Sequence, residues 1–331
     1  MSDVTVMVTG AAGFLGSHLC ASLINDGHRV IGIDDESNGK LRLDSEFIDS
    51  HLFTFLKHDI RDPILVDNIH QIYHLACPAS PVHYQRDPVR TITTNVIGTV
   101  NVLDVARRCR SRVLLASTSE VYGDPLQHPQ SESYLGNVDS LGIRACYDEG
   151  KRCAETLFMD YHRQYGTDVA IARIFNTYGP GMRLDDGRVI SNFMVQALRQ
   201  EPITLFGDGL QTRSFCYVSD LIEGLRKLMD APNHEIGPFN LGNSQEITVY
   251  SLAYRILKIT GSQSPVMYLP LPAGDPVRRQ PDISKALLKL NWKPCILVDE
   301  GIALTIPWFR QLVTDPVTSK IGKLEHAINK E

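Results

Sequence analysis

The 331-residue sequence lacks several features that would each point to a particular class of protein. Its net charge is −5, so there is no basic surplus, and we expect neither nucleic acid nor an anionic membrane as a partner. No apolar run approaches the roughly 20 residues that a bilayer-spanning helix needs. The first residues, MSDVTVMVTGAAGF, have neither a basic start nor a long apolar core, and they predict a strand that enters a turn rather than a signal peptide.

Cysteines are few, and none of them forms a CxxC pair. Their odd number and wide scatter favour a reducing cytoplasm, and they indicate neither a disulfide framework nor a metal site. Cys146 lies beside a tyrosine but has no histidine near it in sequence, so we interpret it as a small packing residue. The seven cysteines are Cys20, Cys77, Cys109, Cys146, Cys153, Cys216 and Cys295.

What the chain does have is a regular alternation of apolar runs and helical periodicity over its first 175 or so residues. Residues 4–9 and 29–35 are apolar and β-branched, and residues 14–27 between them have the period of a helix, which together make one βαβ unit. This alternation predicts an α/β fold built on a doubly wound parallel sheet, the Rossmann arrangement. Further strands are predicted at 52–59, 71–77, 112–119 and 168–176, and long helices at 87–109 and 144–166.

A glycine-spaced turn, TGAAGFLG (9–16), joins the first strand to the first helix. Gly10 permits a tight turn, Gly13 lets the backbone approach a pyrophosphate, and Gly16 lets the helix pack closely on the sheet. The spacing is GxxGxxG rather than the common GxGxxG, so its position between a strand and a helix is what predicts a dinucleotide site.

The end of the second strand indicates which dinucleotide is bound. Asp34 can accept hydrogen bonds from both ribose hydroxyls of NAD and would repel the 2′-phosphate of NADP, although a strand-end Asp can also simply start a turn. NAD is therefore the predicted cofactor. The residues expected to bind it are Gly10, Gly13, Phe14, Leu15, Gly16, Asp34, Asp59, Ile60, Leu75 and Ala76, with Asp59 placed near the adenine.

Tyr147 and Lys151 stand four residues apart in RACYDEGKR (144–152). Four residues are about one helical turn, so both side chains lie on one face of the helix. We expect the ammonium of Lys151 to lower the pKa of the Tyr147 phenol from its ordinary value of about 10. Such a phenol can remove a proton from an alcohol while hydride leaves the same carbon. Alone, this spacing usually marks a helix surface; the glycine turn upstream favours a catalytic pair.

The texture of the sequence changes after residue 177, where glycine and proline become frequent and short elements alternate. We predict an NAD-binding Rossmann domain at 1–176, to which later segments return, and a smaller α/β lobe, mainly for substrate, at 177–331. No low-complexity linker separates the two.

The turn TGAAGFLG followed by YDEGK resembles the extended short-chain dehydrogenase/reductase family of nucleotide-sugar enzymes. Its members use bound NAD as an internal redox tool and include 4-epimerases, 4,6-dehydratases and decarboxylases. The resemblance to the branch that decarboxylates UDP-glucuronate covers essentially the whole chain. It is carried by HLACPASPVHY (74–84), LLASTSEVYGDPLQHPQSE (114–132), RACYDEGKRCAET (144–156), ARIFNTYGPGM with DGRVISNF (172–193) and DPVRRQPDISKA (275–286).

The resemblance implies a carboxy-lyase that oxidises C4 of the sugar, loses CO₂ from the resulting 4-keto acid and reduces C4 again to give UDP-xylose. It places Thr118 on the O4 hydroxyl, and it places Tyr147 and Lys151 among the residues that bind NAD, with Lys151 at the nicotinamide ribose. Ser119 stands where a dehydratase has an acid, which counts against expulsion of a C6 hydroxyl. Glu120 would hold a water or a sugar hydroxyl and help to protonate C5, and Arg279 would serve the substrate carboxylate or proton delivery.

The resemblance also implies a diphosphate-binding arginine, Arg213, whose fork suits phosphate oxygens. Asn176, Arg188 and Asn192 are further candidates for the UDP-sugar, and Tyr217 is expected to support the sugar site. Each of these, taken alone, is more often a surface or turn residue.

Other interpretations stay open at this point. A dTDP-glucose 4,6-dehydratase or another nucleotide-sugar 4-keto enzyme shares most of the motifs, and a non-catalytic NAD-binding sensor shares the fold but often loses the Tyr or the Lys. Ser119 and Glu120 could merely end a strand, and Arg278 and Arg279 could be a solvated pair. In this family helices such as 87–109 and 144–166 form a four-helix interface, so a homodimer is expected.

Overall fold

The computed structural model describes residues 4–39, 41, 45–270 and 278–314, so the first three residues of the stretch 275–286 lie outside it. Its centre is a seven-stranded sheet in which every neighbouring pair is parallel, which confirms the predicted fold class. Across the sheet the strands are β11 (Phe239–Leu241), β6 (Val169–Ile174), β5 (Arg112–Thr118), β4 (Gln71–His74), β1 (Thr5–Thr9), β2 (Arg29–Asp34) and β3 (Phe53–Lys57).

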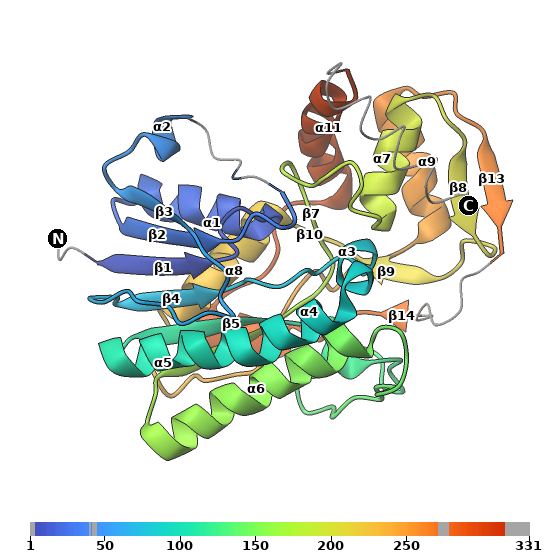
Figure 1. The fold of residues 1–331 in the computed structure, drawn as a ribbon. Helices are drawn as coiled ribbons and strands as arrows, with labels where there is room; N and C mark the ends of the chain where they lie inside the picture. Colours follow the sequence, from blue (N-terminus) through green and yellow to red (C-terminus); the bar gives the residue numbers. More distant parts are fainter. Residues whose placement is uncertain (1–3, 40, 42–44, 271–277, 315–331) are drawn as a thin grey trace.

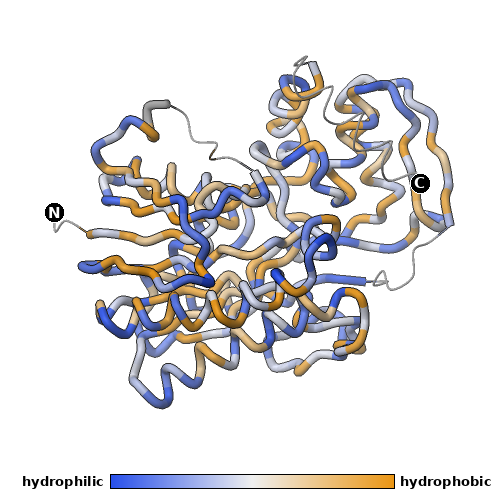
Figure 2. The backbone as a smooth tube through the Cα atoms, viewed as in Figure 1, coloured by the Kyte–Doolittle hydropathy of each residue, from blue (hydrophilic) through white to orange (hydrophobic). Residues whose placement is uncertain are grey.

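The strand order reverses at β1, which has β2 on one side and β4 on the other. In open parallel sheets, ligands bind in the crevice beyond the carboxyl ends of the strands at such a reversal. The apolar runs predicted this sheet because strands covered on both faces are continuously hydrophobic. All seven residues of β5 are buried, and the strands are largely orange in Figure 2.

Helices cover both faces of the sheet, and each face has its own hydrophobic core (Figure 1). One face is covered by α1 (Phe14–Asn25) and α8 (Val218–Met229), and the other by α5 (Thr99–Cys109) and α6 (Ala145–Tyr165). Among the described residues, no helix is both long enough and apolar enough to cross a bilayer.

The helix predicted at 87–109 is divided into three parts. It consists of α4 (Pro88–Thr93), a π-helical turn (Thr94–Gly98) and α5. A Cβ on Gly98 would lie 2.5 Å from the end of the Ile60 side chain, so the π turn packs closely on Ile60 at this glycine. The helix α3 (Pro81–Arg86), which precedes it, was not predicted, and it carries a residue of the site.

The remaining elements lie mostly beyond the carboxyl ends of the central strands (Figure 1). Three small sheets pair β7 with β10, β8 with β13, and β9 with β12 and β14. Because β11 returns to the central sheet beside β6, the later half of the chain is not separate in space. The division at residue 176 stays a prediction.

The bounds of these elements complete the description. The strands are β7 (Thr177–Tyr178), β8 (Ile203–Phe206), β9 (Thr212–Ser214), β10 (Cys216–Tyr217), β12 (Glu246–Thr248), β13 (Val266–Leu269) and β14 (Arg278–Arg279). The helices are α2 (Ser45–Ile48), a 3₁₀ turn (Ser119–Tyr122), α7 (Val189–Leu198), α9 (Val249–Thr260), α10 (Ser284–Leu290) and α11 (Val298–Thr314).

Candidate active site

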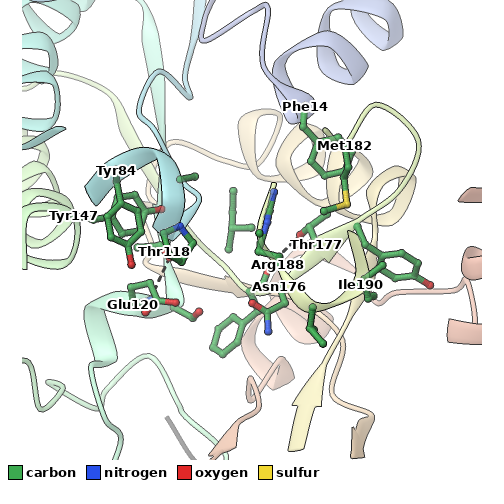
Figure 3. A pocket seen from close by; sticks show the side chains of 18 of the residues that line it. Phe14, Tyr84, Thr118, Glu120, Tyr147, Asn176, Thr177, Met182, Arg188 and Ile190 are labelled. Atoms are coloured by element: carbon green, nitrogen blue, oxygen red, sulfur yellow. Dashed lines mark hydrogen bonds between the residues drawn. The ribbon is translucent and has the colours of Figure 1, made fainter. Parts of the chain in front are cut away.

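A cavity of about 590 Å³ lies at the carboxyl ends of β1, β4, β5 and β6. A smaller cavity of about 120 Å³ shares Gly10, Gly13, Leu75 and Cys77 with it. The two together reach from the end of β2 to the elements that follow residue 177. Figure 3 shows the larger one, with Tyr147 and Glu120 grouped at one side.

The backbone of the glycine turn lies where the two cavities meet, since Gly10 and Gly13 line both of them. Gly10 has φ +74°, and a Cβ there would lie 2.9 Å from the backbone nitrogen of Ala76. A Cβ on Gly16 would lie 2.0 Å from the carbonyl oxygen of Gly10, so the start of α1 lies directly on the turn. Phe14 and Leu15, the first residues of α1, line the larger cavity. A glycine cradle at a helix N-terminus fits the pyrophosphate of a dinucleotide.

Asp34 lines the smaller cavity and is fixed by two backbone donors. Its carboxylate accepts hydrogen bonds from the N–H of Ala12 at 3.0 Å and of Glu36 at 2.8 Å. Its pKa is raised, chiefly by burial and also by the charges of Asp35 and Glu36, although these two hydrogen bonds lower it. Each oxygen keeps a second lone pair, so the geometry fits acceptance of ribose hydroxyls.

Asp59 also lines the smaller cavity, but its carboxylate is engaged by arginines. Arg61 donates to it at 2.7 Å and Arg90 at 3.1 Å, and Arg90 also reaches Asp35 at 2.5 Å. Sequence analysis missed Arg90, because its position in a predicted helix does not show which strand ends it reaches. The smaller cavity is also lined by Ile60, Leu75 and Ala76, which the sequence analysis had named as residues near the cofactor.

Tyr147 lies in the wall of the larger cavity and is 5% exposed. Its phenol and the Thr118 hydroxyl are hydrogen-bonded, so the two side chains lie together in the cavity wall. The ring of Tyr84, from α3, stacks on it with centroids 4.9 Å apart and planes 4° apart. Tyr84 is a residue of the site that sequence analysis missed; only its presence in the stretch 74–84 marked it.

The prediction that the Tyr147 pKa is lowered is wrong when only the groups of the protein act on the phenol. Burial raises the pKa well above its ordinary value, the nearby Cys77 raises it further, and the Thr118 hydrogen bond lowers it less. Lys151 is itself buried and donates to the carbonyl oxygen of Ala116 at 2.9 Å, and burial lowers its pKa. The four-residue spacing correctly indicated that Tyr147 and Lys151 share one face of the helix. It contains no information about how far burial would desolvate the two side chains.

Glu120 is held between two arginines at the same end of the cavity. Arg279, from β14, donates to Oε1, and Arg144, at the start of α6, donates to Oε2. Burial would raise the Glu120 pKa, but the charges of Arg279 and Arg144 outweigh it, so the pKa is lowered. Glu120 is therefore a carboxylate at neutral pH. Ser119, beside it in sequence, is 2% exposed and lines the cavity.

Four of the five residues expected at the nucleotide end line the same cavity. Asn192 donates to the carbonyl oxygen of Gly187 at 3.1 Å, and Arg188 pairs with Asp186 at 2.5 Å. Tyr217 does not line it; its ring packs against Tyr178 in the core. The four that line it are Asn176, Arg188, Asn192 and Arg213.

Within the described part of the chain, no three His, Cys, Asp or Glu residues are grouped so that they could hold a metal ion. The seven cysteines are all unbridged thiols. Cys146 contacts the carbonyl oxygen of Tyr84 at 3.7 Å, and burial raises its pKa, so its environment does not favour a thiolate nucleophile.

A comparison with known protein families agrees with what the glycine turn, the Tyr–Lys pair and the parallel sheet indicate. Residues 6–242 match the model of the NAD dependent epimerase/dehydratase family. The chain belongs to that family. The predicted family and its cofactor, NAD, which the family's description names, are thereby confirmed.

Two similar proteins of known name indicate which branch of the family this chain resembles. UDP-glucuronic acid decarboxylase 1 of Arabidopsis thaliana is 54% identical over 308 residues, which are 93% of this chain and 70% of the relative. UDP-glucuronic acid decarboxylase 1 of Xenopus tropicalis is 47% identical over 326 residues, which are 98% of this chain and 74% of the relative.

Solved structures of the family share the fold at lower identity. The UDP-glucuronic acid 4-epimerase of Bacillus cereus, in complex with UDP-glucuronic acid and NAD, superposes with a TM-score of 0.82 at 28% identity, over 93% of this chain and all of that one. The UDP-glucose 4-epimerase of Thermotoga maritima with UDP-glucose gives a TM-score of 0.83 at 28% identity, over 93% and 99%.

Proposed function

We propose that this family member is an NAD-dependent UDP-glucuronate decarboxylase, a carboxy-lyase that releases CO₂ and forms UDP-xylose. The observation that carries the proposal is the ionised Glu120 between Arg144 and Arg279, in one cavity with the Tyr147–Thr118 pair. The relatives named UDP-glucuronic acid decarboxylase, at 54% and 47% identity, support it.

The first step is oxidation at C4 of the sugar. Tyr147, in hydrogen-bond contact with Thr118, takes the proton of the O4 hydroxyl while the hydrogen on C4 leaves as hydride. NAD, when bound, would supply the hydride acceptor. The glycine turn, Asp34 and Lys151 are proposed to hold it, with Phe14, Leu15, Ile60, Leu75 and Ala76 forming the wall.

The second step breaks the bond between C5 and the carboxylate. The C4 ketone receives the electron pair of that bond, CO₂ leaves, and the resulting enolate takes a proton at C5 from a water held by Glu120. This step requires no acid for a leaving hydroxide, and Ser119 supplies none. Arg279 and Arg144 are positive charges beside the reacting carboxylate, and Glu120 partly offsets them. Hydride then returns to C4, and Tyr147 gives back its proton.

The other end of the cavity is proposed to hold the nucleotide. Arg213 and Arg188 are placed to bind the diphosphate, because a guanidinium matches phosphate oxygens with paired donors. Asn176 and Asn192 are amides in the same wall. For Tyr217 only a supporting role through Tyr178 is left.

We also propose that the protein is a homodimer that uses α4, α5 and α6. Val89, Ile92 and Ile97, on α4 and the π turn, are 69%, 37% and 46% exposed, which leaves apolar surface on these helices. A cytoplasmic location remains a prediction from the scattered cysteines.

A second candidate is epimerisation of the same sugar acid at C4. Structural similarity to the Bacillus cereus UDP-glucuronic acid 4-epimerase favours it, and the oxidation step is the same. The two outcomes diverge at the ketone, where CO₂ is either lost or retained.

The test is to incubate the purified protein with UDP-glucuronate labelled at the carboxyl carbon. We expect labelled CO₂ and UDP-xylose in equal amounts, without added reductant, by gas capture and mass analysis. A product that keeps the label and differs only in the configuration at C4 would replace the proposal with the epimerase. A 4-keto-6-deoxy product from dTDP-glucose, without any CO₂ from UDP-glucuronate, would replace it with the dehydratase.

A further inference from the structure

Arg144 stands at the N-cap position of α6, three residues before Tyr147. Its Nη2 donates to Oε2 of Glu120, and its Nε lies 3.9 Å from Oδ2 of Asp148. The side chain is 25% exposed and lines the larger cavity. One arginine thus connects the helix of the catalytic pair to the carboxylate that follows β5.

The second arginine approaches Glu120 from a different part of the chain. Arg279 lies on β14, donates to Oε1 of Glu120, and also reaches the carbonyl oxygen of Gly123 at 3.4 Å. Because each arginine takes a different carboxylate oxygen, the plane of the Glu120 carboxylate is fixed. With Arg279 alone, rotation about the last side-chain bond would remain free.

Resting on the proposed decarboxylase function, we propose that Arg144 is a positioning residue that fixes Glu120 for the steps after C4 oxidation. Glu120 and a substrate carboxylate carry two negative charges, and Arg144 and Arg279 carry two positive charges. The group is thus neutral before CO₂ leaves. Without Arg144, an excess negative charge would lie beside the forming enolate, and Glu120 would lose its orientation.

The surrounding charges agree with this balance. The groups that face Glu120 are Arg279 from β14, Arg144, Tyr147 and Asp148 from α6, and Tyr84 from α3. Burial raises the pKa of Asp148 to about 7, the charge of Glu120 raises it too, and the two arginines lower it. A second carboxylate charge is thus disfavoured, which leaves Glu120 as the anion that the arginines share.

The test compares Arg144→Met with Arg152→Met in the full chain. Arg152, also on α6, donates to the carbonyl oxygens of Val121 and Leu135 but does not contact Glu120, so it is the matched control. Reduction of bound NAD, followed by absorbance, reports C4 oxidation, and labelled CO₂ reports decarboxylation. For Arg144→Met we expect NADH to form and CO₂ release to fall about a hundredfold, as a small displacement of a catalytic group can produce.

The pH profile gives a readout that a merely structural role would not move. Without the charge of Arg144, burial would raise the pKa of Glu120, so the acidic limb of CO₂ release should shift to higher pH. Arg144→Lys restores a charge and should bring the limb back, but only part of the rate, because an ammonium lacks the guanidinium fork.

The proposal is overturned if Arg144→Met keeps the wild-type rate and acidic limb, or if it loses NADH formation and CO₂ release in equal proportion. It is also overturned if Arg152→Met reproduces the whole pattern. Absence of CO₂ from the wild-type protein would instead overturn the decarboxylase function, and the positioning role would fall with it.

Discussion

The cofactor end and the sugar end of the site arrange their charged residues in contrasting ways. At the cofactor end, Asp59 pairs with Arg61 and Arg90, and these side chains are 20–34% exposed. At the sugar end, Glu120 pairs with Arg279 and Arg144, and the side chains of the three residues are 15%, 7% and 25% exposed. Solvent screens the first group of charges more than the second.

This difference indicates where each end obtains its specificity. The cofactor end relies on backbone, since the contacts of the glycine turn and the N–H groups that bind Asp34 do not involve Arg90. The sugar end relies on buried side chains from three distant segments, and breaking one buried pair leaves an uncompensated charge. Substitutions should therefore have unequal effects at the two ends.

The largest expected effect is that of Tyr147→Phe at the sugar end. Removing the hydroxyl removes the proton acceptor for O4, and turnover should fall by about 10²–10⁴-fold or more. NAD should remain bound, because the glycine turn is untouched; chromatography of released nucleotide measures this. Tyr161→Phe is the control: Tyr161 is on the same helix, but its hydroxyl donates a hydrogen bond to Asp104, so the variant should keep its activity. Near-normal CO₂ release from Tyr147→Phe would refute the assignment of the base.

Next comes Gly16→Ala at the cofactor end. The added Cβ would lie 2.0 Å from the Gly10 carbonyl oxygen, so α1 must shift, at a cost of about 1–3 kcal/mol or more. Both the NAD content and the melting temperature should fall. Gly27→Ala, just after the other end of α1, is the control: its added Cβ meets no atom within 4 Å, so only the φ of +82° opposes the substitution. If Gly27→Ala lost as much NAD as Gly16→Ala, the close approach at the turn would not explain the loss of NAD.

A pH-dependent effect is expected from Asp148, which is 6% exposed. Its pKa is raised to about 7, chiefly by burial, so the folded chain binds a proton that the unfolded chain releases near pH 4. Its stabilising contribution is complete below about pH 4 and is lost as the pH rises through about 7.

Asp148→Asn keeps the shape without the charge. Its free energy of unfolding, relative to wild type, should therefore rise between pH 4 and pH 8, on the order of a few kcal/mol. Urea unfolding at both pH values measures this. Asp160→Asn, on the exposed side of α6, serves as the control. A constant difference between Asp148→Asn and wild type would mean that the carboxyl does not titrate in this range.

The smallest effect is expected from Arg90→Met at the cofactor end. Its pairs with Asp35 and Asp59 are partly exposed, so stability should change by about 1 kcal/mol or less, and NAD affinity by about fivefold or less. Calorimetric titration with NAD measures the affinity. A loss as large as that from Arg144→Met would erase the distinction between the two ends.

Sequence alone determined the parallel sheet, the glycine turn and the shared face of Tyr147 and Lys151. These features depend on residues close together in the chain, where apolar periodicity, backbone freedom and helical spacing decide the geometry. The same local reasoning placed Asp34 at the end of β2, and it expected one helix where the structure has a π turn before α5.

Only the tertiary structure decided the environment of these residues. It removed Tyr217 from the cavity wall, engaged Asp59 with arginines and reversed the expected direction of the Tyr147 pKa shift. It also brought Arg144 and Arg279 to the two oxygens of Glu120. The reason is that desolvation and the meeting of distant charges depend on how the whole chain packs, which the spacing of neighbouring residues does not encode.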